Sequence, residues 1–559
     1  ELTKKCHANN INVIVRVDFR GVEKERYERR PDWFGKNEDG SPLTGWNDII
    51  YRPCYTSYYG KEYAQEYIRR LMTAYDVDGI WENCVIFGYG PCYCESCKQQ
   101  YKEDTALEIP IGEDYNSDQF STYRQWKSAY AKMHMKSMKD IIKSFGEDKV
   151  YVSEIFGMYH ASIAKSSGID LYDAKESFDF LVSPTFIDGC AQEDKKYDNY
   201  DYAASCIRFL SSIAPDKQCV ALTGGNGTKW RYVIAPQQES KIWMWKVISA
   251  GGNIWNNYFN GQFPGKAVDR RNASIEKEFF QYMKDNEAWI DNQIPYGKVG
   301  IFYSRETRDM LCRNDEKEDE YGVFIKGIER VMAEHHIPCI FIPNLEFTYE
   351  TIKDLNVLLL PNTACMSNEE MDAIRRFVKE GGGLIASHMT SLYDEHGQRR
   401  SDFGLKDIFG CSFTGVVKDT EYDSYQKVRC NHPILKDMDI ENTEMIINEG
   451  KTLLCNKTNE SYEGICTYVP PIYNQPPEFA WIPNELTDYP TIVAGSYGKG
   501  RVVYFANQTE KTCYTNGHED LINSYFNGID WARREPFDLT TDAPDSVHIH
   551  VTCNKDNPN

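Results

Sequence analysis

The sequence predicts an α/β protein with a (β/α)8 barrel of the TIM type, a flavodoxin-like doubly wound domain and a short β tail. Short apolar runs alternate with amphipathic stretches through the first 295 residues. A second alternation of the same kind follows a boundary near Gln293-Ile-Pro-Tyr-Gly. The chain of 559 residues is long enough for two or three domains. We therefore expect domains at residues 1–295, 296–535 and 536–559.

The barrel is predicted from strands that alternate with helices. The expected strands are residues 13–19, 78–84, 150–156, 180–186, 219–223 and 253–259, and the expected helices are 62–75, 120–145, 201–214 and 236–250. The helix at 62–75 places Tyr63, Tyr67, Leu71 and Ala74 on one face. Eight strands close such a barrel. One or two strands are therefore expected to precede residue 1, and the helix at 1–8 would belong to one of those units.

The second domain is predicted from a new series of strands and helices. Its expected strands are 298–304, 339–342, 357–360 and 384–388, its helices are 321–335, 368–380 and 521–532, and a hairpin joins 491–494 to 501–505. Between them lies a less regular insert at about 400–485. The alternation at 545–552 is typical of the first strand of a further β domain. This second domain resembles a flavodoxin-like or class I amidotransferase-like fold.

Composition narrows the range of partners. The formal net charge of −21 argues against nucleic acid and against an anionic membrane surface. No apolar run reaches the roughly 18 residues of a membrane span. The 18 cysteines are scattered, mostly in apolar runs, which favours a reducing compartment and a cytoplasmic location. Secretion stays open, because the chain begins with Glu rather than Met.

Acidic residues near predicted strand ends are the candidate catalytic groups. Glu82 ends the strand in Asp78-Gly-Ile-Trp-Glu, and Glu154 ends the strand in Val150-Tyr-Val-Ser-Glu. Side chains at strand carboxyl ends face the mouth of a barrel. Two carboxylates there suit glycoside hydrolysis, and Asp188, after the next strand, is a reserve candidate. A structural acid in an ion pair is the alternative for each.

Charged and aromatic residues near the same strand ends are candidates for binding substrate. They are Arg16, Asp18, Trp81, Trp230, Arg231, Trp255, Asn256 and Tyr258. Aromatic rings can form the floor of a sugar subsite, and packing is the plain alternative. Arg16 and Asp18 could instead pair with each other.

Three cysteines within six residues, Cys92, Cys94 and Cys97, have the spacing of metal ligands. A fourth ligand would close a structural zinc site, and either Cys54 or Cys84 could supply it. No organic cofactor is expected, because the Gly-rich loop before Trp230 lacks the phosphate-binding pattern.

An acid on a barrel strand, a loop and then Cys92-Tyr-Cys-Glu-Ser-Cys resemble the glycoside hydrolase family forty-two β-galactosidases and a looser set of hypothetical glycosyl hydrolases. With the second domain, the resemblance spans nearly the whole chain. The second domain resembles their β-galactosidase trimerisation domain, an amidotransferase-like fold without its catalytic triad. The matching strings are Leu358-Leu-Leu-Pro-Asn, Phe377-Val-Lys-Glu-Gly-Gly-Gly-Leu-Ile-Ala and Gly498-Lys-Gly-Arg-Val-Val-Tyr-Phe.

This resemblance implies a retaining glycosidase, zinc held by four cysteines and a homo-oligomer, a dimer or trimer, built through the second domain. Glu82 falls at the position of the family's acid/base and Cys54 at that of its fourth cysteine. The family's nucleophile is a Glu on a late strand, where this chain has Val220-Ala-Leu-Thr-Gly-Gly. In α-fucosidase-like barrels an acid at the Glu82 position is the nucleophile, so the role of Glu82 stays open.

The sequence therefore predicts a galactosidase-like or fucosidase-like glycosidase that acts on a small glycoside or oligosaccharide. A barrel that binds carbohydrate or serves as a scaffold without catalysis is the alternative, because the late-strand acid is missing. A thiol hydrolase that uses Cys365 with His388 is a third interpretation.

Overall fold

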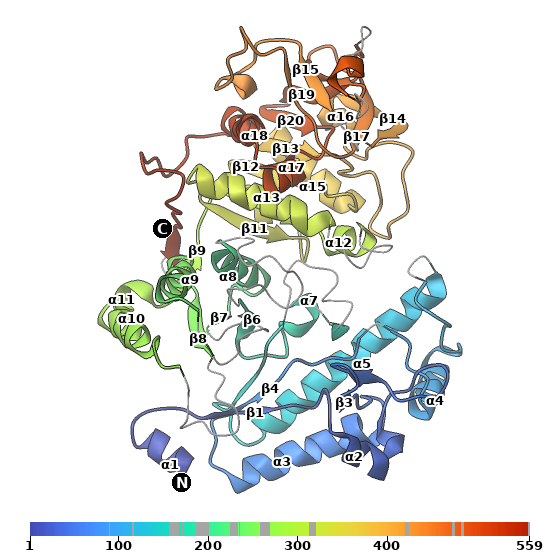
Figure 1. The fold of residues 1–559 in the computed structure, drawn as a ribbon, viewed down its shortest axis with the longest axis vertical. Coiled ribbons are helices and arrows are strands. Elements are labelled where there is room, and N and C mark those ends of the chain that lie inside the picture. Colours follow the sequence, from blue (N-terminus) through green and yellow to red (C-terminus); the bar gives the residue numbers. More distant parts are fainter. Residues whose placement is uncertain are drawn as a thin grey trace. The chain divides into compact units, whose positions relative to one another are not determined.

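The computed structural model describes residues 1–88, 90–114, 117–155, 167–169, 171–185, 201–223, 233, 235–257, 269–311, 320–419, 424–471, 476–481 and 486–556 (Figure 1). The chain divides into two compact units. Unit 1 comprises Glu1–Asp198, Ile213–Val247 and Gly252–Asp285, and unit 2 comprises Asn199–Ser212, Ile248–Gly251 and Asn286–Asn559. The first unit thus ends ten residues before the predicted boundary at 295, and most of the predicted helix at 201–214 belongs to unit 2.

Six parallel strands form the described wall of the barrel in unit 1. They are β1 (Ile14–Val17), β4 (Gly79–Glu82), β5 (Val150–Ser153), β6 (Leu181–Pro184), β7 (Cys219–Thr223) and β8 (Asn253–Asn256). The strand orders are β1-β4-β5 and β6-β7-β8. A parallel bridge between Glu154 and Val182 links β5 to β6. All six predicted barrel strands are therefore present; β7 has the predicted bounds and the other five are shorter than expected.

Side chains from neighbouring strands meet on the inner side of this wall. Val152, Val182, Val220 and Leu222 form a buried cluster with Trp81, Phe180 and Trp255 packed against it. These residues come from or directly precede five different strands. Because side chains alternate along a strand, their strand neighbours point to the outer side, toward the helices. This alternation decides where every candidate at a strand end lies.

Helices α3 (Ala64–Ala74) and α5 (Asp118–Lys143) run along the outer side of the wall near β1 and β4 (Figure 1). The buried face of α3 consists of Ala64, Ile68 and Met72. The predicted face of α3 is therefore wrong, and Tyr67 is 43% exposed. A π-helical turn at Tyr59–Tyr63 precedes α3 and changes the phase of the helix. The other α-helices described in unit 1 are α1 (Leu2–His7), α2 (Lys24–Arg29), α4 (Glu95–Thr105), α7 (Leu171–Ala174), α9 (Gln237–Ser249) and α10 (Ala273–Asp285).

Unit 2 contains a nine-stranded sheet in the order β11-β10-β12-β13-β20-β19-β18-β15-β16. Its parallel part is β10 (Val299–Tyr303), β11 (Cys339–Pro343), β12 (Val357–Leu360), β13 (Gly383–Ser387) and β20 (Gly500–Phe505). This is the flavodoxin-like order 2-1-3-4-5. The predicted hairpin is β19 (Pro490–Tyr497) with β20, and the insert adds the antiparallel strands β15 (Tyr425–Val428), β16 (Met445–Ile447) and β18 (Glu463–Val469).

Helices cover both faces of this sheet. On one face, α15 (Asn368–Lys379) and α16 (Lys406–Phe409) join the main hydrophobic core, with the separate pair β14 (Cys411–Lys418) and β17 (Thr452–Lys457). Helices α13 (Glu320–Glu334), α17 (Thr509–Thr515) and α18 (Glu519–Ala532) pack together. Helix α8 (Tyr202–Ile213) contributes Phe209, whose ring contacts Tyr303 and Phe341.

The predicted strand at 545–552 is wrong, because the described residues before Thr552 form turn and irregular structure. A different short strand, β21 (Thr552–Asn554), pairs antiparallel with β9 (Gln293–Pro295), and the tail belongs to unit 2. No helix in the described ranges is both long and apolar enough to cross a membrane.

Candidate functional site

Glu82 lies on the outer side of the barrel wall, so the expectation that it faces the mouth is wrong. Its side chain is 2% exposed, and it bonds His134 Nε2 on α5 at 2.8 Å and Tyr151 Oη on β5 at 2.6 Å. The physical reason is strand alternation: Trp81, one residue earlier, points to the inner cluster, so Glu82 points away from it. Glu82 is therefore a buried acid within a hydrogen-bond network behind the wall.

Glu154 lies on the inner side, at the carboxyl end of β5. It follows the same alternation as Val152, and one oxygen accepts a hydrogen bond from the Trp81 indole nitrogen. The other oxygen accepts a hydrogen bond from the Cys84 thiol at 3.1 Å. Burial raises the pKa of Glu154, although the hydrogen bonds from Cys84 and Trp81 oppose that effect. A raised pKa is the direction of shift that a general acid requires.

Asp18 is a second acid near this end of the barrel. Its carboxylate accepts a hydrogen bond from Asn83 Nδ2 at 2.7 Å and from Arg20 Nε at 3.1 Å, and Arg16 Nη2 lies 3.6 Å away. Asn83 and Cys84 are consecutive, and they contact Asp18 and Glu154 respectively. The two residues that follow β4 therefore link both carboxylates into one site.

The backbone at this link has an unusual conformation. Cys84 has φ of +44°, a left-handed conformation that side-chain-bearing residues adopt at a cost. The strand begins at Gly79, where a Cβ would meet the Val150 carbonyl oxygen at 2.5 Å. Left-handed backbone at a residue with a side chain, as at Cys84, is concentrated at functional sites. Asn83 was not predicted as a site residue, and Cys84 was predicted only as a metal ligand.

The predicted substrate-binding residues separate into three groups. Trp81, Trp255 and Arg16 lie together on the inner side, with the two indole rings 4.3 Å apart and the Arg16 guanidinium 5.2 Å from the Trp81 ring. Asn256 follows Trp255 and therefore points to the other side, where it lines a small cavity with Thr223 and Ser240. Trp230, Arg231 and Tyr258 lie outside the described residues, as does the reserve catalytic candidate Asp188.

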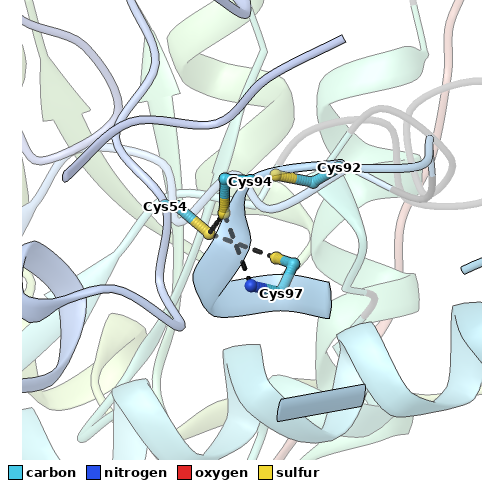
Figure 2. A group of neighbouring side chains, drawn as sticks. All are labelled: Cys54, Cys92, Cys94 and Cys97. Atoms are coloured by element: carbon cyan, nitrogen blue, oxygen red, sulfur yellow. Dashed lines mark hydrogen bonds between the residues drawn. The ribbon is translucent and has the colours of Figure 1, made fainter. Parts of the chain in front are cut away.

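Four cysteines converge behind the loop that follows β4. The ligand sulfurs of Cys54, Cys92, Cys94 and Cys97 all lie within 4.8 Å of one another, and all four residues are buried. Figure 2 shows these side chains grouped together, with Cys97 on helix α4. The sulfur of Cys54 is 3.3 Å from that of Cys97 and 3.6 Å from that of Cys94.

The donor set fits a tetrahedral metal. Zinc–sulfur bonds of about 2.3 Å place tetrahedral sulfurs about 3.8 Å apart. Hydrogen bonds from the other three thiols, chiefly Cys54, lower the pKa of Cys92, which favours a thiolate. The cluster contains Cys54, whereas Cys84 is bonded to Glu154. The four residues could hold a metal ion through a closed set of thiolates.

The thiol-hydrolase interpretation receives no support from the geometry around Cys365. Its backbone N–H donates to Thr307 Oγ1 at 2.9 Å, and its carbonyl accepts from Ser304 Oγ at 3.2 Å. His388 Nδ1 lies 3.3 Å from Asn362 Oδ1, and its Nε2 has no hydrogen-bond partner among the described residues. Burial lowers the pKa of His388 to about 3, so its imidazole is neutral at pH 7.

Comparison with known proteins agrees with the class suggested by this fold and site. Residues 1–84 match a family described as "Hypothetical glycosyl hydrolase 6", and residues 313–532 match one described as "Trehalose utilisation". The search of curated proteins found no match. The chain thus combines a glycosyl hydrolase family match at its N-terminus with an amidotransferase-like domain.

Solved structures share the fold over nearly the whole chain. A β-galactosidase from Bacillus circulans sp. alkalophilus superposes with a TM-score of 0.74 at 12% identity, covering 95% of this chain and 81% of that one. A GH42 β-galactosidase from G. stearothermophilus gives 0.70 at 14% identity, covering 94% and 79%. An α-L-fucosidase from Paenibacillus thiaminolyticus gives 0.65 at 15% identity, covering 95% and 73%. The predicted fold, a TIM-type barrel followed by a flavodoxin-like domain, is confirmed.

Proposed function

We propose that the protein is a glycoside hydrolase whose catalytic carboxylates are Glu154 and Asp18. The observation that carries this proposal is the placement of Glu154 on the inner side of the barrel, with its pKa raised by burial. The glycosyl hydrolase family match over residues 1–84 and the β-galactosidase fold support the same class. This pair replaces the predicted pair of Glu82 and Glu154.

In the proposed mechanism Glu154 is the general acid. Burial raises its pKa, which is the direction of shift that protonation of the leaving glycosidic oxygen requires. Trp81 and Cys84 each donate to one of its oxygens, and these bonds stabilise the carboxylate once the proton has moved. Trp81 and Trp255 present aromatic faces beside the acid, where the C–H face of a sugar ring could pack.

Asp18 is the proposed second carboxylate. Its hydrogen bonds from Asn83 and Arg20 and the nearby Arg16 suit an anion, which could act as nucleophile or activate a water. The same ion pairs favour the alternative function, a barrel that binds sugar without cleaving it, because they would hold Asp18 in a purely structural or binding role.

The test compares Glu154→Gln with Glu82→Gln on a panel of chromogenic α- and β-glycosides, including galactosides and fucosides. General acid catalysis contributes about 10²–10⁴-fold, so Glu154→Gln should lower kcat by that factor. Glu82→Gln should change kcat less than tenfold, since Glu82 lies behind the wall. Wild-type protein that binds sugars but cleaves none of the panel would instead support the binding function.

Two further features belong to the proposal. We infer that the four-cysteine cluster binds zinc as a structural ion, because its all-thiolate donor set suits that metal.

The resemblance of the second domain to a trimerisation domain supports a dimer or trimer, which light scattering coupled to gel filtration would measure. No disulfide joins cysteines within the described ranges, which supports a reducing compartment.

A further inference from the structure

A small hairpin in unit 1 carries an exposed indole ring. Strands β2 (Thr44–Gly45) and β3 (Ile50–Tyr51) pair antiparallel, and Trp46 begins the turn between them. Trp46 is 57% exposed. A single exposed aromatic residue is common on protein surfaces. The surroundings of Trp46 therefore decide whether its ring has a role.

The hairpin lies beside the loop that follows β1. Val22 in that loop forms an antiparallel bridge with Tyr51, with backbone hydrogen bonds of 3.0 and 2.9 Å between the two residues. A Cβ on Gly21 would meet the Ile50 side chain at 2.5 Å, so the two segments are in close contact. Asp18, the proposed second carboxylate, lies in the same loop, directly after β1. The hairpin therefore flanks the candidate site.

One side chain connects the Trp46 ring to Asp18. The Arg20 guanidinium lies 4.9 Å from the centroid of the Trp46 ring, and Arg20 Nε donates to both Asp18 oxygens at 3.1 and 3.2 Å. Arg16 makes the corresponding connection on the other side, 3.6 Å from Asp18 and 5.2 Å from the Trp81 ring. The carboxylate thus lies between two arginines, each beside an indole ring.

The turn holds Trp46 in a costly backbone conformation. Trp46, Asn47 and Asp48 have φ of +52°, +55° and +62°, and left-handed backbone is unusual for a residue as bulky as Trp. Thr44 Oγ1 donates to Asp48 Oδ1 across the turn, and the Ile49 N–H donates to the Trp46 carbonyl at 3.3 Å. Such conformations persist only where the surrounding structure fixes them, and they are concentrated at functional sites.

We propose that Trp46 forms a second sugar subsite and that the substrate is an oligosaccharide of at least two units. One unit packs on Trp81 beside Glu154 and Asp18, and the adjoining unit packs its C–H face on the open surface of the Trp46 ring. The inference deepens the proposed function by naming the substrate class, and it rests on that function.

The test begins with binding, measured on Glu154→Gln so that ligands stay intact. A printed array of mono- and oligosaccharides, including galactosides and fucosides, identifies the tightest ligand. Calorimetry then compares that ligand with its component monosaccharides. The protein should bind the oligosaccharide about tenfold more tightly than any component. Equal affinities, or an array on which no oligosaccharide binds, would overturn the inference.

Substitutions of Trp46 are then made in the same protein. Trp46→Ala should weaken binding of the oligosaccharide about tenfold and leave the affinity for the monosaccharides unchanged. Trp46→Tyr keeps a ring and should retain most of the affinity. Trp46→Gln keeps bulk without a ring, so it should behave like Trp46→Ala and replaces it if thermal denaturation shows that the alanine variant is unfolded.

Tyr75→Ala is the matched control. Tyr75 is 63% exposed and precedes the amino end of β4, whereas the candidate site lies at the carboxyl end of the strands. This control should keep both affinities. An unchanged affinity for the oligosaccharide in folded Trp46→Ala or Trp46→Gln, or an equal loss for the oligosaccharide and the monosaccharides, would contradict the subsite.

The two proposals fail separately. If the binding pattern is observed but the wild-type protein cleaves no saccharide of the array, the hydrolase function is contradicted and the Trp46 subsite stands. If the wild-type protein cleaves an oligosaccharide but removal of the Trp46 ring leaves its affinity unchanged, only the Trp46 subsite is contradicted.

Discussion

Two acids of similar sequence context have opposite environments in this barrel. Glu82 and Glu154 each come at the end of a short apolar strand. Glu82 meets His134 and Tyr151 on the outer side, whereas Glu154 meets Trp81 and Cys84 on the inner side. A shift of one residue along a strand reverses the face of every side chain. The face therefore decides whether a carboxylate lies at the candidate site or among the outer helices.

Glu82→Gln should destabilise the protein by about 1–3 kcal/mol, because one partner of a buried hydrogen-bond network is altered. The amide would present a donor where either His134 or Tyr151 now meets a carboxylate oxygen. Urea denaturation at pH 7 measures the change, and Glu66→Gln on the exposed face of α3 is the control. A variant as stable as the wild type but with lost activity would mean that Glu82 takes part in catalysis.

At the scale of elements, the loop after β4 and the start of α4 carry three of the four cysteines in the cluster. Cys94 is the N-cap of α4, and its sulfur accepts a hydrogen bond from the Cys97 backbone N–H. Cys54 comes from a separate loop forty residues before Cys94. A metal bound by all four cysteines would therefore hold two distant segments together. One of these segments directly follows Asn83 and Cys84 in the chain.

We predict that the purified protein contains about one zinc per chain and that Cys54→Ser loses most of it. Loss of one thiolate opens the closed donor set, so the variant should also melt at a lower temperature. Metal analysis by mass spectrometry with thermal denaturation measures both effects. Cys430→Ser, a partly exposed cysteine outside the cluster, should retain the metal. Wild-type protein without zinc or another bound metal would contradict the assignment.

At the scale of the whole molecule, buried titratable groups make stability depend on pH. Burial raises the pKa of Glu510, on α17, from 4.5 to about 7. The folded state therefore binds more protons than the unfolded state between these values, and its stability falls as pH rises through that window. The pKa of His388, lowered from 6.5 to about 3 by burial, acts in the opposite direction, since stability is lost as pH falls below 6.5.

Glu510→Gln should remove the first of these effects. Relative to wild type, the variant should gain about 3 kcal/mol of stability between pH 4.5 and pH 8. Only the change of this stability difference with pH tests the prediction, because Gln alters the hydrogen bond from Tyr525 Oη at every pH. Urea denaturation across this range measures the gain, and exposed Glu369→Gln serves as the control. A stability difference that does not vary with pH would show that Glu510 is ionised in both states.

The sequence by itself determined the succession of strands and helices, the flavodoxin-like second domain and the set of cysteines from which the cluster is built. These features depend on periodicity and spacing, which local residues encode. It also singled out Glu154, Trp81 and Trp255, because strand ends in a parallel barrel converge at one mouth.

Only the tertiary structure decided which acid faces the site and which cysteine completes the cluster. Each depends on partners far away in the chain: His134 stands 52 residues from Glu82, and Cys54 stands 43 residues from Cys97. The few residues of a short strand do not determine which of them face inward. A shift of one residue exchanges the inner and outer faces. Packing against α5 and the neighbouring strands sets which residues face inward, so the chemistry of the barrel mouth follows from contacts that no local pattern contains.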